Sequence, residues 1–377
     1  MDTSIVCSHC GCDIIGEPFN VDGAVLCEDC CNENTFECDC CGERHLTGSS
    51  HSDDSIIICQ NCFDDHYRRC ERCECLVHDD DVYWNGGYPY CRDCYDDLDD
   101  NDDDDEEDDG FINDYYYKPE PIFYKCPGEK RNRYYGVELE IDKGGKDDSN
   151  AEFILSIANR GEEVLYIKSD GSLEEGMELV SHPCSLKYHR EKYPWEKIMK
   201  TAVGLHYRSH NTTTCGYHVH IGRKELGGDF DKQEEVISRI MFFFEAHWNE
   251  LFKLSRRSEW AIDRWAGRHG YNDKPMEILD KAKKSSKGRY ACVNITNANT
   301  VEIRMFRGTL KLNTFLATLE LVDMICDAAV RLTDNEIHKQ SWSDFVYSIP
   351  NSYTELINYL KEKRLYVNEP VIAEEEL

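Results

Sequence analysis

Hydrophobic and polar residues alternate along several short segments in the second half of the chain. In 134–141, apolar residues alternate with Gly136, Glu138 and Glu140. A period of two places successive side chains on opposite faces of a β-strand. The segment therefore predicts a strand with one apolar face and one acidic face. Two neighbouring carboxylates repel each other and are costly to bury without a cation between them.

The same alternation recurs in three later segments, at 176–181, 215–222 and 300–306. If these strands share a sheet, their polar side chains collect on the face opposite the helices. One histidine among several carboxylates favours Mg²⁺ or Mn²⁺ over zinc. An arginine among carboxylates favours a phosphate ligand, because its planar fork binds phosphate oxygens. The polar members of this expected site are Glu138, Glu140, Glu178, His218, Glu302 and Arg304, and His220 is expected on the same face of its strand as His218.

The remaining pattern predicts an α+β domain with a largely antiparallel sheet and helices on one face. Strands are expected at 134–141, 164–168, 176–181, 215–222, 289–295 and 300–306. Helices are expected at 150–160, 185–203, 231–254, 274–285, 312–332 and 352–364.

The first 94 residues follow a different pattern, which is set by cysteine. Sixteen of the 21 cysteines lie there, and pairs spaced C-x-x-C repeat in units that start at Cys7, Cys38 and Cys70. Each unit supplies four thiolates, the set that a closed structural Zn²⁺ site needs. The spacing resembles treble-clef fingers of the LIM or GATA class. The expected zinc ligands are Cys7, Cys10, Cys27, Cys30, Cys38, Cys41, Cys59, Cys62, Cys70, Cys73, Cys91 and Cys94.

The units are expected to contain hairpins, most clearly at 82–90 around the Asn85-Gly86-Gly87 turn, and a short helix at 63–67. A unit of this length cannot bury enough apolar surface to fold alone, so we expect three structural zinc ions. The alternative ligands left open are Cys12, Cys31, Cys40, Cys75, His9, His45, His66 and His78.

Most of the net charge of −31 lies at the front of the chain. Residues 1–115 contain 33 acidic and 5 basic residues, whereas residues 116–377 contain 41 and 38. Nucleic acids and anionic membranes are bound by Lys and Arg, so we expect neither as a partner and favour a protein or peptide. The acidic run predicts a disordered linker at 95–118, between a zinc module at 1–94 and a second domain at 119–377.

The chain has no N-terminal apolar signal segment and no apolar run of the length that a membrane span needs. We therefore expect a soluble cytoplasmic protein, in which clustered cysteines bind metal rather than form disulfides.

Five motifs of the C-terminal domain, in order, resemble the amidoligase family of carboxylate–amine ligases, which have the glutamine synthetase and glutamate–cysteine ligase fold. The resemblance covers about 130–335 and excludes the cysteine units. The motifs are YGVELE (135–140), KSDGSL (168–173), ELVSHP (178–183), CGYHVH (215–220) and VEIRMFRGT (301–309).

The resemblance implies ATP and two divalent ions as cofactors. One ion would be held by Glu138, His218 and Glu302 near the ATP phosphates. A second would be held by Glu140 and Glu178, with Asp170 nearby. Arg304 would neutralise the transferred phosphoryl group, and Lys168, His220 and Arg257 would contact nucleotide or substrate.

Two other functions fit the same residues. A metallohydrolase would use the His and Glu cluster to activate water and would need no nucleotide, but it leaves Arg304 without a role. A non-catalytic adaptor would use the zinc module to bind a partner. We favour an ATP-dependent ligase that forms an amide bond through an acyl phosphate, on a protein or peptide that the zinc module recruits.

Overall fold

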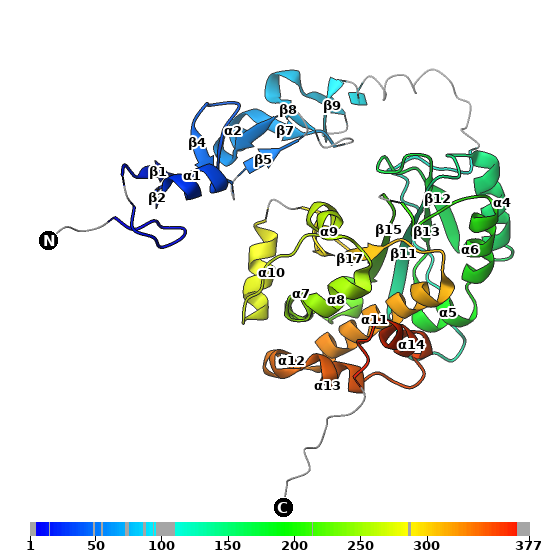
Figure 1. Cartoon of the computed structure of the whole chain (residues 1–377). Coiled ribbons are helices and arrows are strands. Elements are labelled where there is room, and N and C mark those ends of the chain that lie inside the picture. Colours follow the sequence, from blue (N-terminus) through cyan, green and yellow to red (C-terminus); the bar gives the residue numbers. More distant parts are fainter. Residues whose placement is uncertain are drawn as a thin grey trace, which may run out of the picture. The chain divides into compact units, whose positions relative to one another are not determined.

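The structure is a computed structural model (Figure 1). It describes residues 5–14, 16–47, 50–53, 56–71, 75–85, 88–92, 94–95, 110–212, 214–285 and 288–367. The chain divides into two compact units, 1–108 and 109–377. Most of the expected linker lies outside the described residues, so its disorder stays a prediction.

The described end of that expected linker packs against the second unit. The Asn113 amide donates to the Ile167 carbonyl at 2.9 Å, and the Ser169 amide donates to the Asn113 carbonyl at 2.9 Å. The Tyr117 ring meets Tyr166 edge to face. This end of the segment packs on the second unit through these contacts, while the Phe111, Tyr116 and Tyr117 side chains stay exposed.

In its described residues, the first unit is a series of two-stranded antiparallel hairpins with two short α-helices. The predicted hairpin at 82–90 is confirmed, and a helix covers the predicted segment 63–67 almost completely. The hairpins are β1 (Phe19–Val21) with β2 (Ala24–Leu26), β3 (Thr35–Glu37) with β4 (Arg44–Leu46), β5 (Ser50–Ser52) with β6 (Ile57–Cys59), β7 (Tyr67–Arg69) with β8 (Leu76–His78), and β9 (Tyr83–Asn85) with β10 (Tyr88–Tyr90). The helices are α1 (Glu28–Asn34) and α2 (Gln60–His66).

The second unit is organised around a seven-stranded antiparallel sheet. Its order is β12 (Leu165–Lys168), β13 (Met177–Ser181), β11 (Tyr134–Ile141), β15 (Gly216–Gly222), β17 (Thr300–Arg307) and β16 (Val293–Asn294), with β14 (Cys184–Ser185) also paired to β11. The α+β fold class with a large antiparallel sheet is confirmed.

Helices cover the apolar face of this sheet (Figure 1). Val137, Leu139 and Ile141 are fully buried there, in one core with residues of α4, α6, α7 and α11. The helices are α4 (Asp148–Ala158), α5 (Leu186–Glu191), α6 (Trp195–Gly204), α7 (Phe230–Ala246), α8 (Trp248–Ser255), α9 (Glu259–Trp265), α10 (Pro275–Lys283), α11 (Leu312–Arg331), α12 (Asp334–Lys339), α13 (Trp342–Tyr347) and α14 (Thr354–Glu362). Within the described residues, we find no helix with the length and apolar character that a membrane crossing requires.

Three predicted elements were wrong in extent. The helix expected at 185–203 is divided into α5 and α6 before Pro194, which lacks the N–H that a continuous helix needs. The helix expected at 231–254 is interrupted at His247, where φ is −110°. The strand expected at 289–295 shortens to β16, because the backbone before it pairs with Gly267 in an isolated bridge at Ala291.

Candidate functional site

The strand register places the polar side chains of β11 beside those of both neighbouring strands. Glu138 is paired with His218 of β15, and Glu140 with Glu178 of β13. Directly paired residues of antiparallel strands project from the same face of the sheet. Glu178 is also paired with Lys168 of β12, so two adjacent rows of paired residues, contributed by four strands, carry polar side chains on the face opposite the helices. We call this set of side chains the polar row.

A bulge aims the arginine of β17 at this row. His220 is paired with Glu302, but the register shifts between Tyr217 and Val219. As a result, two residues of β17 lie opposite the single residue His218, and Arg304 is one of them. Bulges are frequent beside active sites because they redirect a side chain.

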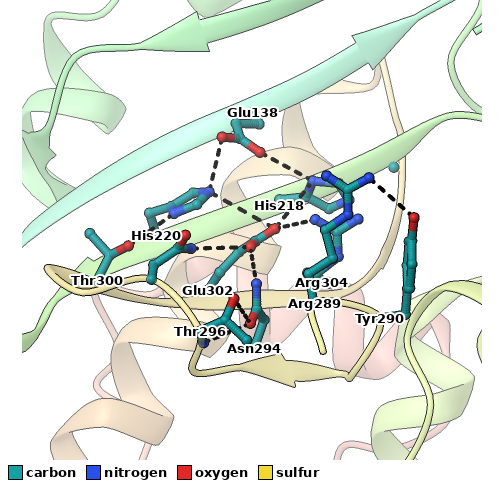
Figure 2. Close-up of polar contacts among 12 residues, drawn as sticks. Glu138, His218, His220, Arg289, Tyr290, Asn294, Thr296, Thr300, Glu302 and Arg304 are labelled. Atoms are coloured by element: carbon teal, nitrogen blue, oxygen red, sulfur yellow. Dashed lines mark hydrogen bonds and ion pairs between the residues drawn. The ribbon is translucent and has the colours of Figure 1, made fainter. Parts of the chain in front are cut away.

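His218 contacts both Glu138 and Glu302 (Figure 2). Its Nδ1 is 3.3 Å from Glu138 Oε2 and 3.5 Å from Glu302 Oε1. Its Nε2 is 3.7 Å from Glu140 Oε1. The side chain is 4% exposed. One imidazole therefore contacts carboxylates from three positions of the sheet.

His220 contacts the same carboxylates from the next position of β15. Its Nε2 is 3.1 Å from Glu138 Oε1 and 4.0 Å from Glu302 Oε1. Burial opposes protonation, but the charges of Glu138 and Glu302 raise the pKa of His220 to about 9. In return, although burial acts in the opposite sense, His220 and His218 hold the pKa of Glu138 well below its ordinary value.

Glu302 is fixed by donors on both of its oxygens. Arg304 Nη1 donates to Oε1 at 2.6 Å, and Asn294 Nδ2 of β16 donates to Oε2 at 2.8 Å. Asn297 Nδ2 also lies 3.4 Å from Oε2. Although burial acts in the opposite direction, the charges of Arg304 and His220 lower the pKa of Glu302. The carboxylate is therefore ionised and held in one orientation.

Glu140 and Glu178 are the two carboxyl groups of the site whose charged forms are disfavoured. Burial, and then the charge of Glu138, raises the pKa of Glu178 well above its ordinary value, although Lys168 Nζ lies 3.6 Å away. Burial raises the pKa of Glu140, and the charge of Asp170 adds to the effect. A divalent cation would relieve both repulsion and desolvation.

The donor set fits such a cation. Ligand atoms of Glu138, Glu178 and His218 all lie within 4.8 Å of one another. Carboxylates with one imidazole suit Mg²⁺ or Mn²⁺. This group unites Glu178 with Glu138 and His218, whereas the resemblance divided these residues between two ions. The assignment of ligands to one ion or two stays a prediction.

Gly216 leaves room for two of the site residues. Its N–H donates a short hydrogen bond to Glu140 Oε2. A Cβ at this position would lie 2.5 Å from His218 Nε2 and 2.8 Å from Arg257 Nη2. Arg257 also donates to the Phe306 carbonyl at 3.2 Å. The structure therefore brings Arg257 to the Glu140 end of the polar row.

Three residues that contribute to the site were not predicted from the sequence. Asn294 orients Glu302, and its only signal was its place in the predicted strand 289–295. Tyr115 and Arg289 lie over the Lys168 end of the site: Lys168 Nζ is 5.5 Å from the Tyr115 ring centroid, and Arg289 donates a hydrogen bond to the Tyr115 hydroxyl. Tyr115 lies in the segment that was expected to be a linker, so no sequence pattern identified it as a site residue.

The first two cysteine units each gather a complete set of four thiols. In each set the Sγ atoms all lie within 4.8 Å of one another, so each can hold a metal ion. In the third unit, Cys70, Cys91 and Cys94 form such a group, whereas Cys73 lies outside the described residues. The two complete sets are Cys7, Cys10, Cys27 and Cys30, and Cys38, Cys41, Cys59 and Cys62.

Equivalent backbone groups support the first cysteine of the first two units. The Cys27 amide donates to Cys7 Sγ at 3.4 Å, and the Cys59 amide donates to Cys38 Sγ at 3.3 Å. Backbone donors from Cys10 and Cys27 lower the pKa of Cys7 to about 6. The pKa of Cys38 also falls to about 6, because backbone donors outweigh burial. Both thiols are therefore poised to ionise, as metal ligands must.

The alternative ligands lie at the margins of these sets. Cys12 Sγ is 3.2 Å from Cys10 Sγ, and His45 Nε2 is 3.7 Å from Cys41 Sγ. Cys31 is buried and close to the Thr35 hydroxyl.

Comparison with known proteins bears on the second unit. Residues 142–326 match the model of a family described as "Putative amidoligase enzyme". The match contains Glu178, His218, Glu302 and Arg304, and it confirms the resemblance predicted from the five motifs. No curated protein matches the chain.

Solved structures of 3-hydroxy-3-methylglutaryl-coenzyme A reductase from Streptococcus pneumoniae are only distantly similar. One is 13% identical, with 63% of this chain and 72% of that chain covered, at a TM-score of 0.16. A second is 12% identical, with 64% of each chain covered, at the same TM-score. A similarity this low carries no argument about fold or function.

Proposed function

Because the chain belongs to the amidoligase family, we propose that it is an ATP-dependent ligase that joins a carboxylate to an amine. A carboxylate is a poor acylating agent, since an oxide or hydroxide would have to leave. Transfer of the γ-phosphoryl group of ATP to the carboxylate makes an acyl phosphate and releases ADP. The amine then attacks the acyl carbon, loses a proton, and displaces inorganic phosphate.

The observation that carries this proposal is the buried polar row on one face of the sheet. Burial and neighbouring acids raise the pKa of Glu140 and Glu178, which a bound cation would counteract, and Glu138, Glu178 and His218 are the first candidates to hold one. Glu302 and Glu140 adjoin them through His218. A bound Mg²⁺ or Mn²⁺ would neutralise phosphate oxygens during phosphoryl transfer.

The position of Arg304 favours a phosphoryl-transfer enzyme over a metallohydrolase that only activates water. Its guanidinium is anchored on Glu302, and the charges of Glu302, Glu138 and Glu140 outweigh burial and raise its pKa, so it stays charged. A fixed cation beside a metal site stabilises the charge that develops on a transferring phosphoryl group. Lys168, beside Glu178, and Arg257, beside Gly216, are the proposed nucleotide or substrate contacts.

The test is ATP turnover by the full chain. We expect ADP formation that requires Mg²⁺ or Mn²⁺, a carboxylate and an amine, with the substrates supplied by a cell lysate and the new amide identified by mass spectrometry. Glu138→Gln and Glu302→Gln should abolish ADP formation while the thermal unfolding transition persists. Full turnover in both variants would refute the site assignment, and amide hydrolysis without ATP would favour a metallohydrolase.

We also propose that the first unit recruits a protein or peptide substrate. Its cysteine sets provide structural metal sites, and its few basic residues make nucleic acid a poor partner. Residues 110–377 alone should then retain turnover of a small surrogate substrate but lose turnover of the natural one. Equal activity on the natural substrate would contradict recruitment.

A further inference from the structure

A cavity of about 380 Å³ lies among α6, α11, α14 and the loop at 207–211. Val203 of α6, Thr314 of α11 and Tyr359 of α14 line it, so it opens on the helix-covered side of the sheet. None of the lining residues belongs to the polar row described above. A volume of this size suits a small ligand.

The cavity lining is strongly cationic. Its basic residues outnumber its acidic ones five to one, in a unit whose overall charge is close to neutral. Glu362 is the acid, and its two oxygens lie 3.4 Å from Lys311 Nζ and 3.4 Å from Lys363 Nζ. The basic residues are Arg208, His210, Arg256, Lys311 and Lys363.

Two of these cations have no carboxylate partner among the described residues. Arg208 donates to the Tyr207 carbonyl, and Arg256 donates to the Arg307 carbonyl. The buried Nη1 atom of Arg256 has no hydrogen-bond partner in the described part of the chain. Burial lowers the pKa of His210, and the charges of Arg307, Arg256 and Lys363 lower it further.

The cavity also borders the N-terminus of the longest helix of the unit. α11 begins at Leu312, and its N-cap residue Lys311 gives the first turn no side-chain acceptor. The Leu312 and Asn313 amides lie in the first turn, where N–H groups have no acceptor within the helix, and the positive end of the helix dipole there is suited to an anion. Arg256, Lys311 and Thr314 all line the cavity, so the basic residues and the first turn of α11 border the same space.

We propose that this cavity is a second ligand site that binds the phosphate group of a small phosphorylated molecule. The four permanent cations and Glu362 leave a formal charge of +3, which a dianionic phosphate offsets better than one carboxylate does. Oxygen acceptors of phosphate can be shared among lysine, arginine and backbone donors.

The site is separate from the polar row but adjoins it through consecutive residues. Arg256 faces the cavity, at φ 65°, whereas the next residue, Arg257, lies beside Gly216 and His218 in the polar row. Occupancy of the cavity would therefore act on the residue next to a proposed active-site cation. The inference does not depend on ligase activity, because the cavity can be tested without nucleotide.

The experiment is a titration of the full chain with inorganic phosphate, without divalent metal or nucleotide, followed by amide NMR shifts. We expect saturable shifts of Leu312 and Asn313. The double variant Lys311→Gln/Lys363→Gln should weaken binding at least about tenfold. The matched control is Lys361→Gln, an exposed lysine of α14 outside the cavity, and it should bind as the wild type does.

Glu362→Gln provides a test of opposite sign. Removing the cavity's acid should tighten phosphate binding about threefold, as expected for loss of one nearby like charge in a solvated setting. The proposal is overturned if Leu312 and Asn313 do not shift, if the lysine double variant binds as tightly as the control, or if acetate binds as tightly as phosphate.

Discussion

Replacement of Gly216 by alanine tests the geometry of the polar row directly. The new Cβ would lie 2.5 Å from His218 Nε2, 2.8 Å from Arg257 Nη2 and 3.2 Å from His218 Cδ2. Ordinary carbon contacts begin near 3.5 Å. The His218 ring must therefore move by about an ångström, because β15 is held between β11 and β17 and cannot yield easily.

The expected losses of stability and of reaction rate follow from these short contacts. Overpacking of this kind costs about 1–3 kcal/mol of stability, so the domain should stay folded. A displacement of about 1 Å at a reacting centre costs about 100-fold in rate. We therefore expect Gly216→Ala to lower metal-dependent ADP formation about 100-fold and to weaken Mn²⁺ binding, with a modest drop in Tm.

The assay combines Mn²⁺ binding by electron paramagnetic resonance with ADP release and thermal unfolding. Gly161→Ala is the control, because an added Cβ there meets no atom within 4 Å. If Gly216→Ala binds Mn²⁺ and turns over ATP as the wild type does, His218 and Arg257 are not part of the working site.

Three further predictions concern other parts of the chain. Asn294→Ala removes the 2.8 Å hydrogen bond to Glu302 and should weaken Mn²⁺ binding about 10–100-fold, measured by calorimetry. Burial raises the pKa of Glu320 to about 7, so its stabilising protonated form is lost as pH rises from 4.5 through about 7. The wild type should lose up to about 3 kcal/mol of unfolding free energy over this range relative to Glu320→Gln, measured by denaturant titration. A zinc chelator should unfold residues 5–95 by NMR and leave the thermal transition of the second unit unchanged.

Each of these three predictions has a result that would contradict it. An unaltered Mn²⁺ affinity in Asn294→Ala would remove this residue from the support of Glu302. Parallel pH profiles of the wild type and Glu320→Gln would show that burial does not shift this carboxyl. Persistence of the hairpin resonances in chelator would mean that the first unit folds without metal.

The sequence was most informative where one pattern determined one structural feature. The period of two in β11 predicted which side chains share a face, and the cysteine period predicted the thiol groups of the first two units. The bulge at Arg304 was not predictable, because it depends on how β15 and β17 align across more than 80 residues of chain. Asn294 acts through a strand of two residues, which periodicity cannot define.

Two helices that were not predicted, α12 and α13, do have a signal in the sequence. α12 and α13 begin with complete capping boxes, Thr333 with Glu336 and Ser341 with Asp344, which mark short helices that hydrophobic periodicity does not reveal. Tyr115 had no such signal, because its place over Lys168 depends on how its segment packs along β12.

The central claim is that the carboxylates and histidine of one sheet face bind a divalent ion that in turn holds ATP. Calorimetric titration of ATP into the full chain, with and without Mg²⁺, tests it most directly. We predict saturable binding that requires Mg²⁺ and disappears in Glu138→Gln. ATP binding of equal strength without Mg²⁺, or no binding in its presence, would contradict the account.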